Sequence, residues 1–244
     1  MADSSSLPTI IVPARLASSR FPRKLLADAG GVPLILRTAM RLAEQVPEYE
    51  LIFAVDGKEL AKPLQQNGFY CIFSDPELPS GTDRIAFANQ TLQREEVLNV
   101  QADEPMVTRD HITALTRGLR KKGADLATLA TPFYKSKDFK DPNQVKVVID
   151  RDGFALFFSR SPVPYDRDSQ RDIPQAAFKH LGLYGYRRTF LNEFIKLPHG
   201  VLEDLEKLEQ LRALENGKRI SVEVVDQGTI GVDTEEDLAL LSFQ

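Results

Sequence analysis

The chain has 244 residues, of which 42% are hydrophobic and 27% are charged. Its 31 Lys and Arg residues against 35 Asp and Glu give a formal net charge of −4, which does not favour a general nucleic-acid binder. The single cysteine, Cys71, excludes an intrachain disulfide and a multi-cysteine zinc site, and the length is compatible with one large α/β domain.

The sequence pattern does not indicate secretion, and we expect no membrane-spanning segment. No basic segment precedes the first apolar run, and Pro13 and Arg15 interrupt that run early. No apolar stretch approaches the roughly 18 residues that would span a bilayer. We therefore expect a cytoplasmic protein without a membrane partner.

Strand-like and helix-like segments alternate over the first half of the chain. Apolar runs predict strands, whereas the spacing of apolar residues predicts helices between them. In chain order the strands are Leu7–Val12, Leu51–Val55, Phe69–Phe73 and Val97–Gln101, and the helices are Pro33–Val46, Lys58–Gln66, Thr82–Leu92 and Thr108–Lys121. This alternation predicts an α/β fold, with a mostly parallel sheet covered by helices on both faces and ligands bound where the strands end.

The second half is richer in strands. The segments Leu126–Pro132, Gln144–Ile149 and Phe154–Ser159 are strand-like, and Asp150–Gly153 is a turn that makes a hairpin of the last two. A long loop is expected over Ser161–Ala177. A helix over Leu202–Leu214, a strand over Ile220–Val225 and a helix after Asp233 complete the prediction. We predict one domain, residues 1–244, with a smaller β-rich lobe inserted at about 132–200.

The loop after the first strand concentrates positive charge. Between Pro13 and Lys24 it contains Arg15, Arg20 and Arg23 together with serine hydroxyls. Cations at the carboxyl end of a strand are suited to a polyphosphate, because arginine can bind two oxygens while lysine supplies a compact charge. The alternative interpretation is a solvated basic loop. Neither a P-loop motif nor a dinucleotide-binding glycine motif occurs here.

Two acidic residues follow predicted strands. Asp103 lies in the segment Asn99–Pro105, and carboxylates at such a position suit Mg²⁺, which binds one or two of them together with substrate phosphates. Asp233 precedes the last helix, where Thr234 and Asp237 have the spacing of a capping arrangement. From the residues alone, Asp233 is therefore either a second metal ligand or a cap-region acid.

Small polar residues introduce the helix that begins near Thr82. The segment Ser80–Arg84 suits either a simple helix cap or the binding of a base or phosphate by backbone N–H groups. His180 begins an aromatic and glycine-rich segment, and no pair of histidines has metal-binding spacing.

Six motifs occur in one order from the first strand to the last helix. They are Ile11–Arg15 through Lys24, Ser80–Arg84, Asn99–Pro105, His180–Arg187, Leu208–Arg212 and Gly231–Thr234. Together they closely resemble the CMP-Kdo synthetases, which are 3-deoxy-manno-octulosonate cytidylyltransferases with a Rossmann-like nucleotidyltransferase fold. The resemblance implies a Mg²⁺-dependent transfer in which CTP and the acidic sugar Kdo give CMP-Kdo and pyrophosphate for lipopolysaccharide biosynthesis.

The resemblance also implies a set of site residues and a homodimer. Arg15, Lys24 and Asp103 are the expected catalytic residues, and Asp103 and Asp233 are the expected Mg²⁺ ligands. CTP is expected to contact Pro13, Ala14, Arg15, Ser19, Lys24, Ser80, Thr82, Arg84 and Asp103. The sugar is expected to contact Gln101, Arg160, His180, Tyr184, Glu209 and Gln210. The β-rich lobe and the late helix are candidate dimer contacts.

The sequence departs from the family's pattern next to two of these residues. The family commonly has glycine where Arg23 and Ala102 stand, and proline shortly after the lysine, where Leu25 and Leu26 stand. These departures leave the expected catalytic groups in place. They do not determine which sugar is the substrate. The same reaction on 8-amino-8-deoxy-Kdo or a sialic-acid-type sugar is one alternative, and a non-catalytic nucleotide-binding module is another.

Overall fold

The computed structural model describes residues 6–18, 21–168 and 172–241. Contacts between Cα atoms divide the chain into two compact units, residues 1–112 with 229–244 and residues 113–228. The first unit is therefore made of two separate sequence segments, and the second is continuous in sequence. Helix α4 (Arg109–Leu119) contains the boundary between them.

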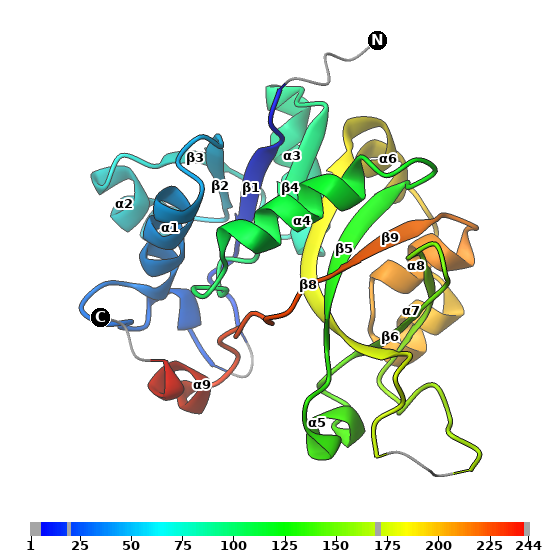
Figure 1. Cartoon of the computed structure of the whole chain (residues 1–244). Coiled ribbons are helices and arrows are strands. Elements are labelled where there is room, and N and C mark those ends of the chain that lie inside the picture. Colours follow the sequence, from blue (N-terminus) through cyan, green and yellow to red (C-terminus); the bar gives the residue numbers. More distant parts are fainter. Residues whose placement is uncertain (1–5, 19–20, 169–171, 242–244) are drawn as a thin grey trace. The chain divides into compact units, whose positions relative to one another are not determined.

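The first unit contains a parallel four-stranded arrangement in the order β3-β2-β1-β4. Its elements are β1 (Thr9–Ala14), η1 (Lys24–Leu26), α1 (Leu34–Gln45), β2 (Leu51–Val55), α2 (Lys58–Gln66), β3 (Tyr70–Phe73), α3 (Gly81–Leu92), β4 (Glu96–Asn99) and α9 (Glu235–Leu240). All six residues of β1 are buried, as expected for a central strand covered on both faces. Figure 1 shows α1 and α2 beside each other on one face of this sheet and α3 on the other.

The second unit is built around a mixed sheet. Its elements are β5 (Leu126–Pro132), α5 (Ser136–Lys140), β6 (Lys146–Ile149), β7 (Ala155–Ser159), β8 (Ala177–Arg187), α6 (Arg188–Phe194), α7 (Val201–Glu206), α8 (Gln210–Glu215) and β9 (Ile220–Val224). Strand β5 pairs with β8 in antiparallel and with β9 in parallel orientation. The hairpin predicted around Asp150–Gly153 is present, since β6 and β7 pair in antiparallel orientation.

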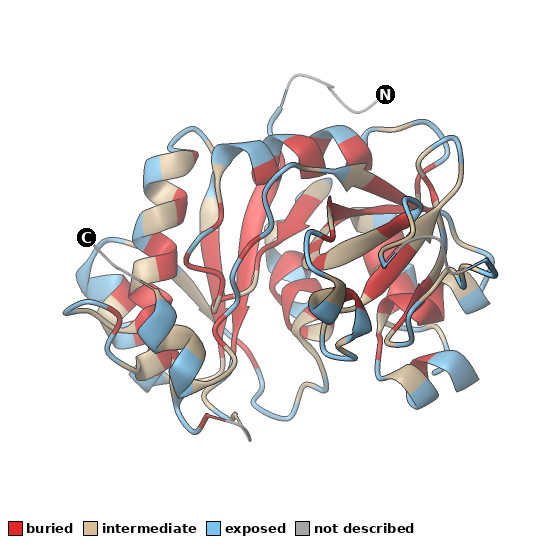
Figure 2. Ribbon diagram, turned by 60° about the horizontal axis from the view of Figure 1, so that its bottom comes forward, coloured by how far each residue is buried: buried red, intermediate tan, exposed pale blue. Residues whose placement is uncertain are grey.

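The α/β fold class is confirmed, and the predicted strands and helices of the first half are all found. The stretch predicted to be β-rich, about 132–200, lies inside the second unit; the single-domain organisation stays a prediction. Buried residues, red in Figure 2, follow the strands of both units. Among the described residues, no helix has both the length and the apolar character that crossing a bilayer requires.

One predicted helix is wrong. The stretch Leu202–Leu214 forms two helices, α7 and α8, because Lys207 adopts a left-handed conformation with φ 52°. Tertiary contacts hold the end of α7 in place: the Glu206 carboxylate accepts hydrogen bonds from Ser159 Oγ at 2.6 Å and from the Arg160 backbone N–H at 2.8 Å. The leucine periodicity gave no sign of this break, and Leu205 is 75% exposed instead of facing the core.

Candidate active site

A cavity of about 400 Å³ lies in the first unit, where β1 and β4 end. Parallel strands direct their carboxyl ends to one edge of a sheet, so loops distant in sequence meet there. The residues that line the cavity are Pro13, Ala14, Arg15, Ala17, Ser18, Lys24, Leu25, Pro79, Ser80, Gly81, Arg84, Gln101, Ala102, Asp103 and Asp233. Most of the residues predicted to bind CTP, and both predicted metal ligands, are therefore gathered in one place.

Lys24 is at the centre of the charged part of this cavity. Its ammonium donates a short hydrogen bond to Asp103 Oδ2, a second at 2.8 Å to the carbonyl of Val232 and a third at 3.1 Å to Asp233 Oδ1. The pKa of Lys24 is raised: burial acts to lower it, but attraction and hydrogen bonding from Asp103 and Asp233 outweigh that effect. The two predicted metal ligands thus converge on a single point, which a lysine ammonium occupies.

Hydrogen bonds to the main chain hold the segments that carry Asp103 and Asp233. The Thr38 hydroxyl donates to the buried carbonyl of Ala102 at 2.8 Å, and the backbone N–H of Val232 donates to the carbonyl of Asp103 at 2.9 Å. The turn after β4 and the segment before α9 are therefore joined directly by main-chain hydrogen bonding. This joint sets the separation of the two carboxylates.

The structure shows which residues cap α9 beside Asp233. The cap of α9 is Thr234, whose hydroxyl accepts from the Asp237 backbone N–H at 3.1 Å. Asp237 completes the capping box by accepting from the backbone N–H groups of Thr234 and Asp233 at 2.9 and 3.0 Å. The capping is done by these neighbours, and the Asp233 carboxylate is directed at Lys24.

Two arginines line the cavity in different ways. Arg15 is exposed, whereas the Arg84 side chain is buried, and its Nη1 donates to the Ser74 hydroxyl and, at 3.1 Å, to the carbonyl of Asp75. Burial lowers the pKa of Arg84 from its ordinary value, and the charge of Asp56 acts against that lowering. Arg84 is thus a fixed cation in the wall, while Arg15 is a solvent-facing one.

The start of α3 forms another part of the wall. Ser80 is the helix cap and exchanges hydrogen bonds with Asp83, accepting from its backbone N–H at 3.1 Å and donating to its carboxylate at 2.6 Å. A side chain on Gly81 would bring a Cβ within 3.3 Å of the Pro13 ring, which allows little beyond glycine. Thr82 is buried and does not line the cavity. Ser19 lies outside the described residues.

Several cavity residues were not among the predicted site residues. They are Ala17, Ser18, Leu25, Pro79, Gly81 and Ala102. All of them are neighbours of predicted residues, and the motif Ser80–Arg84 already contained Gly81. Only their position next to a motif residue could have predicted them, because their side chains have few groups that bind or react with a ligand.

Three of the predicted sugar residues form a cluster in the second unit. The ring of His180 lies 5.5 Å from that of Tyr184, and its Nε2 is 3.0 Å from the Thr128 hydroxyl. Burial lowers the pKa of His180 to about 3, so the imidazole is neutral at pH 7. The pKa of Tyr184 is raised well above its ordinary value by burial and by the charges of Tyr186 and Glu209. The aromatic segment of β8 and the start of α8 therefore meet.

The other predicted sugar residues differ in their surroundings. Arg160 donates from Nε, Nη1 and Nη2 to the main-chain carbonyls of Glu206, Pro142 and Lys207 at 2.6, 3.1 and 3.5 Å. Its guanidinium therefore braces the junction between α7 and α8. Gln210 is 4% exposed, and its Nε2 has no hydrogen-bond partner among the described residues. Gln101 lines the cavity of the first unit and donates to Asn99 at 3.3 Å.

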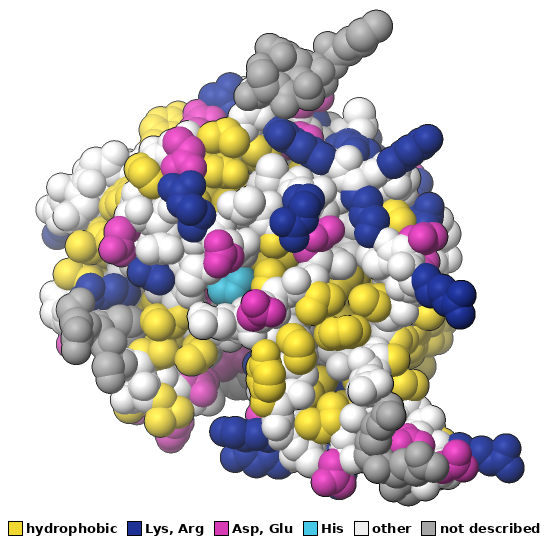
Figure 3. All heavy atoms as spheres, in the orientation of Figure 1, with side chains coloured by type: hydrophobic (Ala, Val, Ile, Leu, Met, Phe, Trp, Pro, Cys, Tyr) yellow, Lys and Arg dark blue, Asp and Glu magenta, His cyan; other side chains and the backbone are white. Residues whose placement is uncertain are grey.

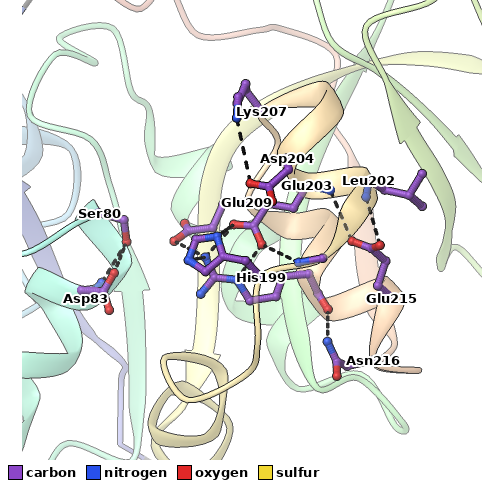
Figure 4. A network of polar contacts seen from close by, with 12 residues as sticks. Ser80, Asp83, His199, Leu202, Glu203, Asp204, Lys207, Glu209, Glu215 and Asn216 are labelled. Carbon is purple, nitrogen blue, oxygen red and sulfur yellow. Dashed lines mark hydrogen bonds and ion pairs between the residues drawn. The ribbon is translucent and has the colours of Figure 1, made fainter.

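A polar network supports the residues at the start of α8 (Figure 4). Arg212 binds Glu203 through two hydrogen bonds, at 2.8 and 2.6 Å, and its Nη2 lies 3.9 Å from Glu209 Oε1. Burial acts to raise the pKa of Glu203. The hydrogen bond and positive charge of Arg212 lower that pKa and outweigh the effect of burial, so the net shift is downward. Glu215 accepts from the backbone N–H groups of Leu202 and Glu203 at 3.0 and 3.3 Å and so caps α7.

Comparison with known proteins assigns this arrangement to a family. The sequence model described as Cytidylyltransferase matches residues 9–220. The chain belongs to the cytidylyltransferase family. The resemblance predicted from the six motifs is thereby confirmed.

Curated cytidylyltransferases of this kind match almost the whole chain. The 3-deoxy-manno-octulosonate cytidylyltransferase of Chloroherpeton thalassium is 41% identical over 233 residues, which cover 94% of each chain. The protein of the same name from Syntrophobacter fumaroxidans is 45% identical over 232 residues, covering 93% of this chain and 92% of that one.

Solved structures agree with this assignment. A CMP:2-keto-3-deoxy-manno-octonic acid synthetase complexed with CTP superposes with a TM-score of 0.88 at 34% identity, covering 96% of this chain and 98% of that one. A cytidylyltransferase from Leptospira borgpetersenii, at 12% identity and a TM-score of 0.59, shares the fold.

Proposed function

We propose that this cytidylyltransferase transfers CMP from CTP to 3-deoxy-manno-octulosonate, giving CMP-Kdo and pyrophosphate. The observation that carries the proposal is the convergence of Lys24, Asp103 and Asp233 in the cavity at the ends of β1 and β4. The names and close similarity of the curated relatives support the choice of nucleotide and sugar.

The cavity suits a nucleoside triphosphate. Arg15 and Lys24 supply positive charge for the phosphates, and Arg84 adds a cation held in the wall. Pro13, Ala14, Ser80 and Gly81 line the same cavity with short side chains, so a base and ribose can approach the backbone closely. Holding the α-phosphorus in line with the attacking oxygen is the main task in such a transfer.

We further propose that Asp103 and Asp233 hold Mg²⁺. Two carboxylates that already meet around one cation fit such an ion, which takes its other oxygens from substrate phosphates and water. Among the described residues no group of three acidic, histidine or cysteine side chains forms a metal site, so these two acids would be the protein's contribution. When bound, the ion would neutralise charge on the phosphates.

The sugar acid would be recognised by the cluster of His180, Tyr184, Glu209 and Gln210 in the second unit. A neutral imidazole, a phenol and a carboxylate can bind the hydroxyl groups of a sugar by donating and accepting hydrogen bonds. The buried amide of Gln210 offers a donor that ligand oxygen would satisfy. Arg160 donates hydrogen bonds to three main-chain carbonyls and would act by stabilising the junction between α7 and α8.

The reaction is a substitution at phosphorus. The anomeric hydroxyl oxygen of the sugar bonds to the α-phosphorus, the bond from that phosphorus to the bridging oxygen breaks, and pyrophosphate leaves. The proton of the hydroxyl is released in the same process. Preorganised positive charge around the leaving oxygens is the largest contribution that residues such as Lys24 and Arg15 can make.

We also propose that the protein acts as a homodimer in the cytoplasm and supplies lipopolysaccharide assembly. Large hydrophobic side chains are exposed on the second unit, namely Tyr134, Leu156, Tyr165, Val201 and Leu205. They belong to the β-rich stretch and the late helices that were expected to make dimer contacts. Figure 3 shows hydrophobic side chains gathered on part of the face in view, amid mixed acidic and basic ones.

The proposed function is tested by pyrophosphate release from purified protein. CTP and Mg²⁺ are incubated in parallel with Kdo, 8-amino-8-deoxy-Kdo and a sialic acid, with reactions lacking metal as controls. Fast metal-dependent release with Kdo is expected. Preference for another sugar would transfer the same chemistry to that substrate, and CTP binding without release from any sugar would favour a binding module.

A further inference from the structure

The ammonium of Lys24 has no remaining donor. It carries three N–H groups, and Asp103, Asp233 and the carbonyl of Val232 accept one hydrogen bond each. The side chain is 13% exposed. Lys24 is thus bound in the way that a small cation would be bound, by two carboxylates and a carbonyl oxygen.

We propose that Lys24 occupies the cation position between Asp103 and Asp233, and that a divalent ion binds these acids only when the ammonium moves away, a movement that the nucleotide phosphates favour by offering it another partner. The inference rests on the proposed function, because it takes these two acids as the metal ligands. It makes Lys24 the residue that sets the binding order, with nucleotide and metal entering together and metal alone binding weakly.

Charge and geometry both lead to this order. An ammonium and a divalent ion repel each other strongly at the separation of two groups that share the same carboxylate oxygens. The triphosphate offers the lysine a stronger partner, and the flexible four-carbon stem of lysine allows the ammonium to change partners without movement of the backbone. Nucleotide binding therefore frees the two acids.

Thermodynamic linkage gives the inference a measurable form. If nucleotide increases the affinity for metal, metal increases the affinity for nucleotide by the same factor. Removing the lysine should remove this part of the coupling. It should also expose the acids, so that metal binds more tightly to the nucleotide-free protein.

Arg15 provides the matched control. It lines the same cavity and has the same charge, but it makes no ion pair with Asp103 or Asp233. Arg15→Met therefore changes the net charge of the cavity as Lys24→Met does, without vacating the position between the acids.

The test is Mn²⁺ binding to the nucleotide-free full-length protein, measured by the electron paramagnetic resonance signal of free Mn²⁺. Lys24→Met is expected to bind Mn²⁺ at least about tenfold more tightly than wild type, and Arg15→Met less than about threefold. Equal tightening in both variants would mean a general charge effect and would overturn the inference, as would unchanged affinity in Lys24→Met. Circular dichroism verifies folding of each variant.

A second measurement uses the wild-type protein and remains decisive if Lys24→Met fails to fold. Acetylation of Lys24 by acetic anhydride, quantified by mass spectrometry, should increase when saturating Mg²⁺ displaces the ammonium into solvent. It should decrease again when CTP is added. Unchanged Lys24 labelling at saturating Mg²⁺ would show that metal and lysine are bound together and would refute the proposal. Loss of activity with all sugars, by contrast, would refute the proposed function alone.

Discussion

Asp237 accepts a hydrogen bond from the backbone N–H of Asp233 at 3.0 Å, and the two acids have different roles. Asp237 stabilises the start of α9, and the Asp233 side chain is left to pair with Lys24. Four residues apart in sequence, they should differ completely when substituted.

Asp237→Ala should cost stability and leave turnover almost unchanged. Loss of a capping carboxylate typically costs about 1 kcal/mol of unfolding free energy. Asp233→Asn should instead reduce kcat by about a hundredfold or more while changing stability little, because it removes a proposed metal ligand. Urea unfolding and pyrophosphate release on both variants distinguish the two; equal kinetic losses would contradict the division.

Asp103→Asn should abolish turnover while the fold survives. The Asp103 backbone keeps its hydrogen bond to Val232 in this variant, so the turn should persist. The change removes one of the two carboxylates around Lys24, and with it half of the charge proposed to hold Mg²⁺. Steady-state kinetics with CTP and Kdo measure the effect, and an active Asp103→Asn enzyme would contradict the metal assignment.

Arg23 is in the left-handed conformation, with φ 59°, just before the short helix that begins with Lys24. This explains why glycine is common in the family at this position. Arg23→Gly and Arg23→Ala both lose the exposed ion pair with Glu59, but only alanine retains the conformational penalty of a side chain. We expect the glycine variant to be more stable than the alanine variant by about 1 kcal/mol in chemical denaturation; the reverse order would contradict this explanation.

Removing only one member of the buried ion pair between Arg212 and Glu203 should lower the free energy of unfolding substantially. Arg212→Met leaves a buried carboxylate without its partner, which typically costs about 3 to 5 kcal/mol. Adding Glu203→Gln should restore part of the loss, as thermal or urea unfolding will measure. Because Arg212 also lies near Glu209, the double variant should show a raised KM for Kdo with an unchanged KM for CTP. Equal changes in both KM values would contradict the positioning role.

His180 makes stability dependent on pH. Its folded pKa of about 3 is below the ordinary value of 6.5, so the unfolded chain binds the proton more readily between these values. The His180 contribution to stability is therefore present above pH 6.5 and is lost as pH falls toward 3. His180→Gln should flatten the decline of the unfolding free energy between pH 7 and pH 4. A decline as steep as in wild type would contradict a neutral, buried imidazole.

Local patterns predicted the location of the nucleotide cavity because parallel strands end at one edge of a sheet. That rule placed Lys24 and Asp103 together although they are far apart in sequence, whereas Asp233 was expected to follow a strand and instead lies in an irregular segment, nine residues after β9 ends. It did not predict that the lysine lies between the acids, since this depends on the main-chain joint between Asp103 and Val232. The break at Lys207 was missed for a similar reason, because Ser159 and Arg160 hold the end of α7 through tertiary contacts.

The described part of residues 229–241 belongs to the same compact unit as the described residues before Thr113. Lys24 and Asp233 are separated by 209 positions, so their contact closes a very long loop of the polypeptide. During synthesis from the N-terminus, the charged centre can be assembled only after the whole second unit has been made. A nascent chain that does not yet contain Asp233 would therefore have most of the fold but an incomplete charged centre, so the residue that completes the site is made long after the residue it pairs with.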